Sequence, residues 1–174
     1  MVAENPAKRE LQYSSAAAGH PSGGGWKCNG FLRFAGETVT GLAPDQLARR
    51  GLSRTFQNLQ IFSRMSVLEN VMVGRHRHER TGIFSDLLHS PSVTRQNKAT
   101  GEAARTALAR VDLADAADRP ANSLSYGALK RLEIARALAS EPTLLLLDEP
   151  AAGCNPVETQ DIDLVIRSLV KDGI

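Results

Sequence analysis

Apolar residues in the second half of the chain recur every three or four positions, which is the spacing of a helix that buries one face. The pattern predicts helices over residues 93–111 and 125–139, and a third that begins at Pro156. Lys130 and Arg136 carry charge around the second apolar stripe, so that helix is predicted to be amphipathic. The residues predicted to lie on the buried faces are Ala104, Leu108 and Val111; Leu129, Leu132, Ala135 and Leu138; and Ile162, Val165, Ile166 and Leu169.

Two shorter helices are marked by the signals at their ends. A proline at the first position and a glycine just beyond the last predict a helix over residues 44–50. Ser66 and Glu69 have the spacing of a capping box, in which each side chain satisfies a free backbone N–H of the first turn. This helix is predicted to end near Gly74, so residues 66–120 have the pattern of a helical insertion.

Strands are predicted over residues 31–35, 52–56 and 144–147. The last of these runs shows no polar alternation, which suits a central parallel strand covered on both faces. Four leucines also fit one turn of a buried helix, but the flanking Pro142 and Pro150 favour the strand. Helices and strands alternate in this part of the chain, which predicts an α/β fold with a parallel sheet.

Residues 1–29 contain clusters of Ser, Ala and Gly without apolar periodicity, which predicts a flexible tail. Its Gly23–Gly25 triplet and Lys27 suggest a phosphate-binding loop. However, Trp26 stands where glycine must precede the lysine, and Cys28 replaces the hydroxyl that binds Mg²⁺. The linker interpretation is therefore favoured.

The composition excludes several classes of protein. The chain has 174 residues, of which 42% are hydrophobic and 23% charged, as in an ordinary globular domain. A net charge of +2 is too small to indicate a nucleic-acid or membrane-surface partner. The two cysteines, Cys28 and Cys154, form neither a disulfide framework nor a zinc motif. No apolar run is long enough to cross a bilayer, so a role at a membrane would place the spans in another chain.

Two motifs carry candidate chemistry. A helix that opens with Ser125 and Gly127 offers free backbone N–H groups and the positive end of its dipole to a phosphate. An apolar strand that ends in Asp148 and Glu149 supplies carboxylates for Mg²⁺. Simpler explanations are an N-cap for Ser125 and a pair of solvated acids. Together the motifs predict part of an ATP site, although the sequence lacks a Gly-rich loop that ends in Gly-Lys-Ser or Gly-Lys-Thr.

Several motifs occur in the order and spacing of the ATP-binding subunits of ABC transporters, which the chain resembles. They are Thr55-Phe56-Gln57, Leu124-Ser125-Tyr126-Gly127, the strand from Leu144 to Glu149, and the run from Ala151 to Pro156. Residues 48–58 and 66–75 are similar to the branched-chain amino acid importers within that family. The resemblance implies an incomplete P-loop NTPase fold, with a parallel-sheet core and an inserted α-helical subdomain.

The resemblance runs from about residue 30 to the end of the chain and implies three parts. Residues 30–60 would hold core strands and the Q-loop. Residues 61–140 would form the helical subdomain with the signature helix. Residues 141–174 would carry the Walker B strand, the D-loop and the helix that follows.

The resemblance also assigns roles to individual residues. Glu149 would polarise the attacking water, and Gln57 would sense the γ-phosphate as a second catalytic residue. Asp148 and Gln57 would hold Mg²⁺. A nucleotide held mainly by a partner subunit would contact the signature residues Leu124, Ser125, Tyr126 and Gly127, beside the D-loop residues Gly153 and Asn155.

The function implied is ATP binding and hydrolysis, with ATP and Mg²⁺ as cofactors, in an importer of branched-chain amino acids. The partners implied are a second ABC ATPase subunit, identical or different, and transmembrane permease subunits, with no nucleic acid. The protein would lie at the cytoplasmic face of the plasma membrane as a peripheral subunit. One alternative is a non-catalytic module that pairs with an intact ABC ATPase or a membrane subunit. Another is an ABC ATPase outside transport, such as a repair or translation protein.

Two parts of the family pattern are expected to be missing. The phosphate-binding loop should precede Phe31, where the Gly/Ser/Ala tail stands, and a strand with a switch histidine should follow Ile174. The chain is therefore expected to be a truncated copy that binds ATP weakly, or not at all, on its own. An incomplete sheet would leave an apolar strand edge exposed, which predicts marginal stability or aggregation.

Overall fold

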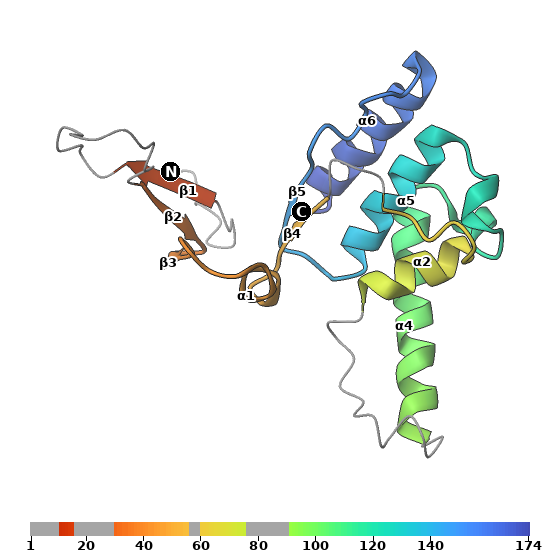
Figure 1. Ribbon diagram of the computed structural model, residues 1–174, viewed down its shortest axis with the longest axis horizontal. Coiled ribbons are helices and arrows are strands. Elements are labelled where there is room, and N and C mark those ends of the chain that lie inside the picture. Colours follow the sequence, from red (N-terminus) through yellow and green to blue (C-terminus); the bar gives the residue numbers. More distant parts are fainter. Residues whose placement is uncertain (1–10, 16–29, 56–59, 76–90) are drawn as a thin grey trace, which may run out of the picture. The chain divides into compact units, whose positions relative to one another are not determined.

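The computed structural model describes residues 11–15, 30–55, 60–75 and 91–174 (Figure 1). The chain divides into two compact units, residues 1–50 and residues 51–174. Each unit has its own secondary structure and is described by itself. All of the site residues predicted above, apart from those outside the described residues, lie in the second unit.

The first unit contains a small antiparallel sheet and a short helix. Its elements are β1 (Leu11–Ser15), β2 (Gly30–Phe34), β3 (Glu37–Thr38) and α1 (Pro44–Arg49). The strand order is β1-β2-β3, with Leu11 opposite Phe34. Ala35 and Gly36 join β2 to β3 with φ of 52° and 83°, the positive values that a tight hairpin turn requires. Phe34 and Val39 are buried and supply the core of this unit.

Strand β1 lies within the segment that was predicted to be a flexible tail. Residues 1–29 were predicted to form a flexible tail with little fixed structure, but residues 11–15 pair with β2 along five positions. The segment Leu-Gln-Tyr-Ser-Ser alternates apolar and polar residues, and that alternation is the signal of a strand with one covered face. The tail was predicted from the Ser, Ala and Gly clusters of residues 1–29 as a whole, in which a pattern of five residues carries little weight.

The described residues of the second unit form four helices around one core. They are α2 (Val67–Gly74), α4 (Pro91–Arg110), α5 (Tyr126–Leu138) and α6 (Pro156–Lys171), with 3₁₀ turns at Ala114–Ala116 and Ala121–Ser123. Helix α5 packs against α2, α4 and α6. The predicted core residues Ala104, Leu108 and Val111 are fully buried, as are Leu132 and Ala135. None of the helices in the described part of the chain has the length and apolar content needed to cross a membrane.

A parallel pair of strands completes the second unit. Strands β4 (Leu52–Arg54) and β5 (Leu144–Leu146) align with Leu52 opposite Leu144. The three leucines of β5 are half-buried, and the parallel pairing that the sequence predicted for this strand is present. A central strand needs a neighbour on each side, and β4 is the only strand that pairs with β5 among the described residues.

The start of α2 is fixed by its cap and by the chain that follows α4. The predicted capping box is present: the Glu69 N–H donates to Ser66 Oγ at 3.1 Å, and the Ser66 N–H donates to Glu69 Oε2 at 2.7 Å. Hydrogen bonds from Ser66 lower the pKa of the Glu69 carboxyl. The next two N–H groups of the helix donate to the carbonyls of Arg119 and Ala117. The helix therefore begins with its first backbone donors satisfied.

We predict that a methyl group at Gly74 destabilises the second unit. A Cβ added at Gly74 would overlap the carbonyl oxygen of Arg136 where α2 meets α5. Gly74→Ala should lower the free energy of unfolding by about 1–3 kcal/mol, because the backbone of α5 must move. Urea denaturation followed by circular dichroism measures the change.

The matched control is Gly101→Ala in α4, where an added Cβ would meet nothing within 4 Å beyond its chain neighbours and the backbone of its own helix. This variant should be more stable than the wild type by about 0.5–1 kcal/mol, since glycine costs that much inside a helix. Equal stabilities for the two variants would contradict the close crossing of α2 and α5.

Candidate functional site

The predicted signature residues lie at the start of α5. Ser125 is the N-cap, and its Oγ accepts a hydrogen bond from the N–H of Ala128 at 3.3 Å. Leu124 is half-buried, Tyr126 is 44% exposed and Gly127 is buried. The N-cap interpretation of Ser125 is thus confirmed, and a phosphate role is compatible with it because the helix end still carries its positive dipole.

The predicted D-loop residues precede α6 and lie next to the signature. Gly153 has a φ of 80°, and a Cβ added to it would lie 3.1 Å from the Tyr126 ring. Asn155 caps α6 by accepting the Glu158 N–H at 2.9 Å. The fold therefore brings together two segments that were predicted separately, around residues 124–127 and 153–155.

Glu158 joins these two segments, and the sequence analysis did not single it out. Its carboxylate accepts the Gly127 N–H at 2.9 Å and the Asn155 N–H at 3.2 Å. These two backbone donors, with further contributions from Ser125 and Arg131, lower the pKa of the Glu158 carboxyl. The spacing Asn155-x-x-Glu158 is a capping box that could have been recognised in the sequence, whereas its contact with Gly127 is tertiary.

The predicted acid pair lies at the end of β5. The Asp148 N–H donates to Thr55 Oγ1 at 3.2 Å, and the Asp148 carboxylate pairs with Arg54 at 2.8 Å. Glu149 follows with a φ of 46°, a left-handed conformation that a residue with a side chain rarely adopts. Positive φ values of this kind are found at functional sites more often than elsewhere, but they do not identify the chemistry.

The donors at this strand end fit Mg²⁺ in part. Mg²⁺ prefers oxygen ligands and is commonly held by one or two carboxylates together with nucleotide phosphates. Asp148 and Glu149 supply carboxylates, although Arg54 occupies one oxygen of Asp148. Among the described residues, no three or more His, Cys, Asp or Glu side chains form a group that could hold a metal ion. The predicted ligand Gln57 lies outside the described residues.

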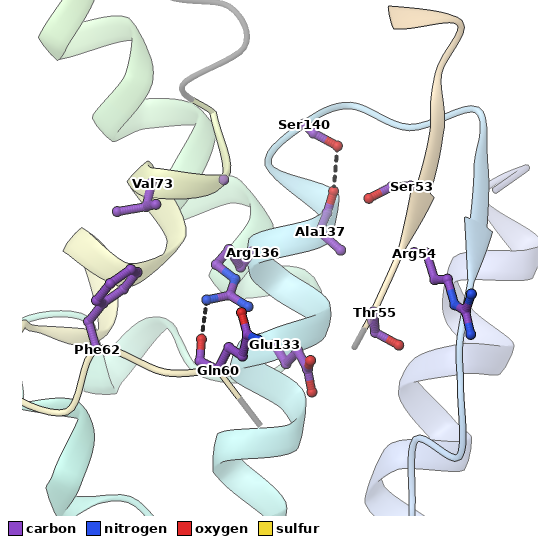
Figure 2. A pocket seen from close by; sticks show the side chains of 11 residues that line it. Ser53, Arg54, Thr55, Gln60, Phe62, Val73, Glu133, Arg136, Ala137 and Ser140 are labelled. Carbon is purple, nitrogen blue, oxygen red and sulfur yellow. Dashed lines mark hydrogen bonds between the residues drawn. The ribbon is translucent and has the colours of Figure 1, made fainter. Parts of the chain in front are cut away.

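A cavity of about 290 Å³ lies between β4, α2 and α5. Figure 2 shows Arg136 of α5 directed toward Gln60, whose carbonyl accepts its hydrogen bond, with Phe62 and Val73 on one side and Ser53 and Thr55 on the other. Burial lowers the pKa of the Arg136 guanidinium, and the neighbouring Glu133 carboxylate raises it. The guanidinium therefore fixes the chain at residue 60 against α5.

Asn70 holds the same segment from the other side. This fully buried side chain accepts the Phe62 N–H at 2.9 Å and donates to the carbonyls of Phe62 and Ser66 at 3.0 and 2.9 Å. Each polar atom of the amide is satisfied, as a buried asparagine requires. The segment that follows residue 59 is thereby tied to α2.

Comparison with known proteins gives the family. The sequence profile of the ABC transporter family matches residues 22–152. The chain belongs to this family. Its match begins at residue 22, whereas the resemblance was expected to begin near residue 30, so part of the predicted tail lies within the matched region.

Two curated relatives are transport subunits. The high-affinity branched-chain amino acid transport ATP-binding protein LivG of Salmonella typhimurium is 43% identical over 147 residues, covering 80% of this chain and 58% of the relative. BraF of Pseudomonas aeruginosa, which has the same description, is 42% identical over 140 residues, covering 80% of this chain and 55% of the relative. The chain therefore spans a little over half the length of the curated relatives it matches.

Solved structures give the same fold. A nucleotide-free ATP-binding cassette from an ABC transporter matches with a TM-score of 0.68 and 31% identity, over 83% of this chain and 56% of that one. The ADP conformation of the ATP-binding cassette MJ1267 matches with the same score and 32% identity. The chain thus has the α/β fold of ABC ATPase cassettes, a P-loop NTPase fold, as the sequence predicted.

We predict that Glu158 makes the stability of the chain depend on acid pH. A carboxyl with a lowered pKa stabilises the folded state fully above the ordinary pKa of glutamate, about 4.3, and loses that contribution as the pH falls through the folded-state value. The stability difference between wild type and Glu158→Gln should therefore be constant near neutrality and shrink below about pH 4. Thermal unfolding at a series of pH values measures it.

Asp161→Asn is the charge-matched control, since it removes a carboxylate from the same helix and leaves the contact of Glu158 with Gly127 in place. If the difference between wild type and Glu158→Gln stayed constant down to about pH 2, the assignment of a low pKa to Glu158 would be contradicted.

Proposed function

We propose that the chain is an ATP-binding subunit of an ABC importer for branched-chain amino acids. The observation that carries the proposal is the identity of 43% with LivG over 80% of the chain. The arrangement of Ser125 and Gly127 at the N-terminus of α5 supports it, because that end presents backbone N–H groups and a positive dipole. LivG and BraF are described as branched-chain amino acid transport proteins, and the proposal extends that substrate class to this chain.

In this proposal the signature contacts a nucleotide that another subunit holds. Ser125 and Gly127 would contact the γ-phosphate, with Leu124 and Tyr126 shaping the loop and with Gly153 and Asn155 at the same interface. One related structure, a bacterial ABC transporter cassette with 25% identity and a TM-score of 0.61, is described as dimeric. The partner would be a second ABC ATPase subunit, and both would lie on permease subunits at the cytoplasmic face of the membrane.

The acid pair would serve the chain's own nucleotide. Asp148 would hold Mg²⁺ with the help of Gln57, and Glu149 would polarise the attacking water beside it. Bound Mg²⁺ would neutralise charge on the phosphates. Arg54 pairs with Asp148 in this structure, so its side chain would have to move away before Asp148 could bind a cation. Arg54 is well exposed, and such a movement would meet little steric resistance.

A non-catalytic role is the second candidate. The hydrogen bonds that join the signature to the D-loop lie within residues 124–158, so a partner surface could be complete without hydrolysis by this chain. Glu149→Gln separates the two candidates. The ATPase proposal requires this change to lower hydrolysis in a mixture with an intact subunit, whereas the interaction module would tolerate it.

We predict that ATP drives association of this chain with a complete subunit of the subfamily. Mixing the chain with purified LivG and ATP·Mg²⁺ should produce a heterodimer in analytical ultracentrifugation. Ser125→Ala should weaken this association about ten- to a hundredfold, because a hydrogen bond to a charged group contributes about 1.5–3 kcal/mol.

Ser123→Ala is the control, since Ser123 lies two residues earlier and its hydroxyl donates to the carbonyl of Pro120. Its association should equal that of the wild type. Calorimetry with ATP and the chain alone should show affinity far below that of LivG, the outcome expected when the Gly-Lys-Ser/Thr loop is missing. Association that is independent of ATP, or equal in both serine variants, would contradict the proposal.

A further inference from the structure

The carboxylate of Glu158 lies on the N-terminus of α5, although Glu158 belongs to α6 and follows Gly127 by 31 residues along the chain. Both of its oxygens are used, one by the Gly127 N–H at 2.9 Å and the other by the Asn155 N–H at 3.2 Å. The Gly127 N–H is one of the donors that the proposed function gives to a phosphate. That donor already has an anionic acceptor within the same chain.

The stem of Glu158 blocks the same position sterically. A Cβ added to Gly127 would lie 2.6 Å from Cβ and Cγ of Glu158 and 2.7 Å from its Cδ. The glutamate side chain therefore lies flat against the glycine backbone, in the space that only the absence of a side chain leaves open. A phosphate oxygen could not reach the Gly127 N–H from this side while Glu158 remained there.

Hydrogen bonds and a neighbouring positive charge stabilise the ionised carboxylate of Glu158. The hydrogen bonds from the Gly127 and Asn155 N–H groups, with a smaller contribution from Arg131, lower the pKa of the Glu158 carboxyl and so favour its ionised form. An incoming phosphate would meet a full negative charge at the point where it needs a donor.

We propose that Glu158 is an internal occupant of the anion position at the start of α5, which a phosphate carried by a partner subunit must displace. The inference rests on the proposed function, because that function supplies the phosphate. It adds a regulatory step. Without nucleotide, the Gly127 N–H of the signature is hydrogen-bonded to Glu158, and it becomes available only when a phosphate displaces that carboxylate. Displacement would also release the Asn155 N–H, so the D-loop changes its hydrogen bonding in the same event.

Titration with inorganic phosphate, followed through the amide resonance of Gly127, tests the proposal. In Glu158→Ala the N–H is vacated, so phosphate should shift the Gly127 resonance in a saturable way. In the wild type the same shift should require at least about tenfold more phosphate, the ratio that roughly 1.4 kcal/mol of competition gives. Glu158→Gln lacks the negative charge, so the phosphate concentration that it requires should lie between those of Glu158→Ala and the wild type. Asp161→Asn, which removes one charge from the same helix, should titrate like the wild type.

The outcomes separate this inference from the proposed function. Equal phosphate titrations for wild type and Glu158→Ala would overturn the inference and leave the phosphate role of Gly127 intact. No shift in either protein would overturn the inference and the phosphate role together. Should Glu158→Ala fail to fold, Glu158→Gln and Glu158→Asp decide. A Glu158→Gln titration like that of the wild type would then overturn the inference, and recovery of the wild-type response in Glu158→Asp would support it.

Discussion

The burial of α5 among three other helices is the constraint on which the rest of the second unit depends. Leu132, Ile134 and Ala135 lie within one turn of the helix and point in different directions, yet all are buried. A helix can bury such positions together only when other elements surround it. Helices α2, α4 and α6 do so, and the contact with α6 brings the D-loop to the signature.

The sequence predicted most elements of this arrangement because their signals are local. Caps, helical spacing and flanking prolines gave α1, α2, α5 and α6 to within a residue or two at each start. The signature and the acid pair were found for the same reason, as each is a short run whose residues act together. Their roles stay predictions, and Gln57 lies outside the described residues.

The features that escaped prediction depend on tertiary contacts. Lys130 carries the charge that usually marks a solvent-facing position, but it is buried beside the Tyr126 ring, and Glu133 is buried on the same helix. A charge on a helix indicates solvent only while no other element covers it. Glu158 escaped for a similar reason: its capping box is visible in the sequence, whereas its hydrogen bond with Gly127 requires α5 and α6 to be packed.

The two ends of α5 are hydrogen-bonded to different parts of the chain. Gly127 is bonded to Glu158 of α6 at one end, while Arg136 is bonded to the carbonyl of Gln60 near the other. The helix between them is closely packed, and packed helices move as units because local bending would open voids in the core. The packed body of α5 therefore connects Gly127 with the wall of the cavity at Arg136, where α5 crosses α2 closely at Gly74.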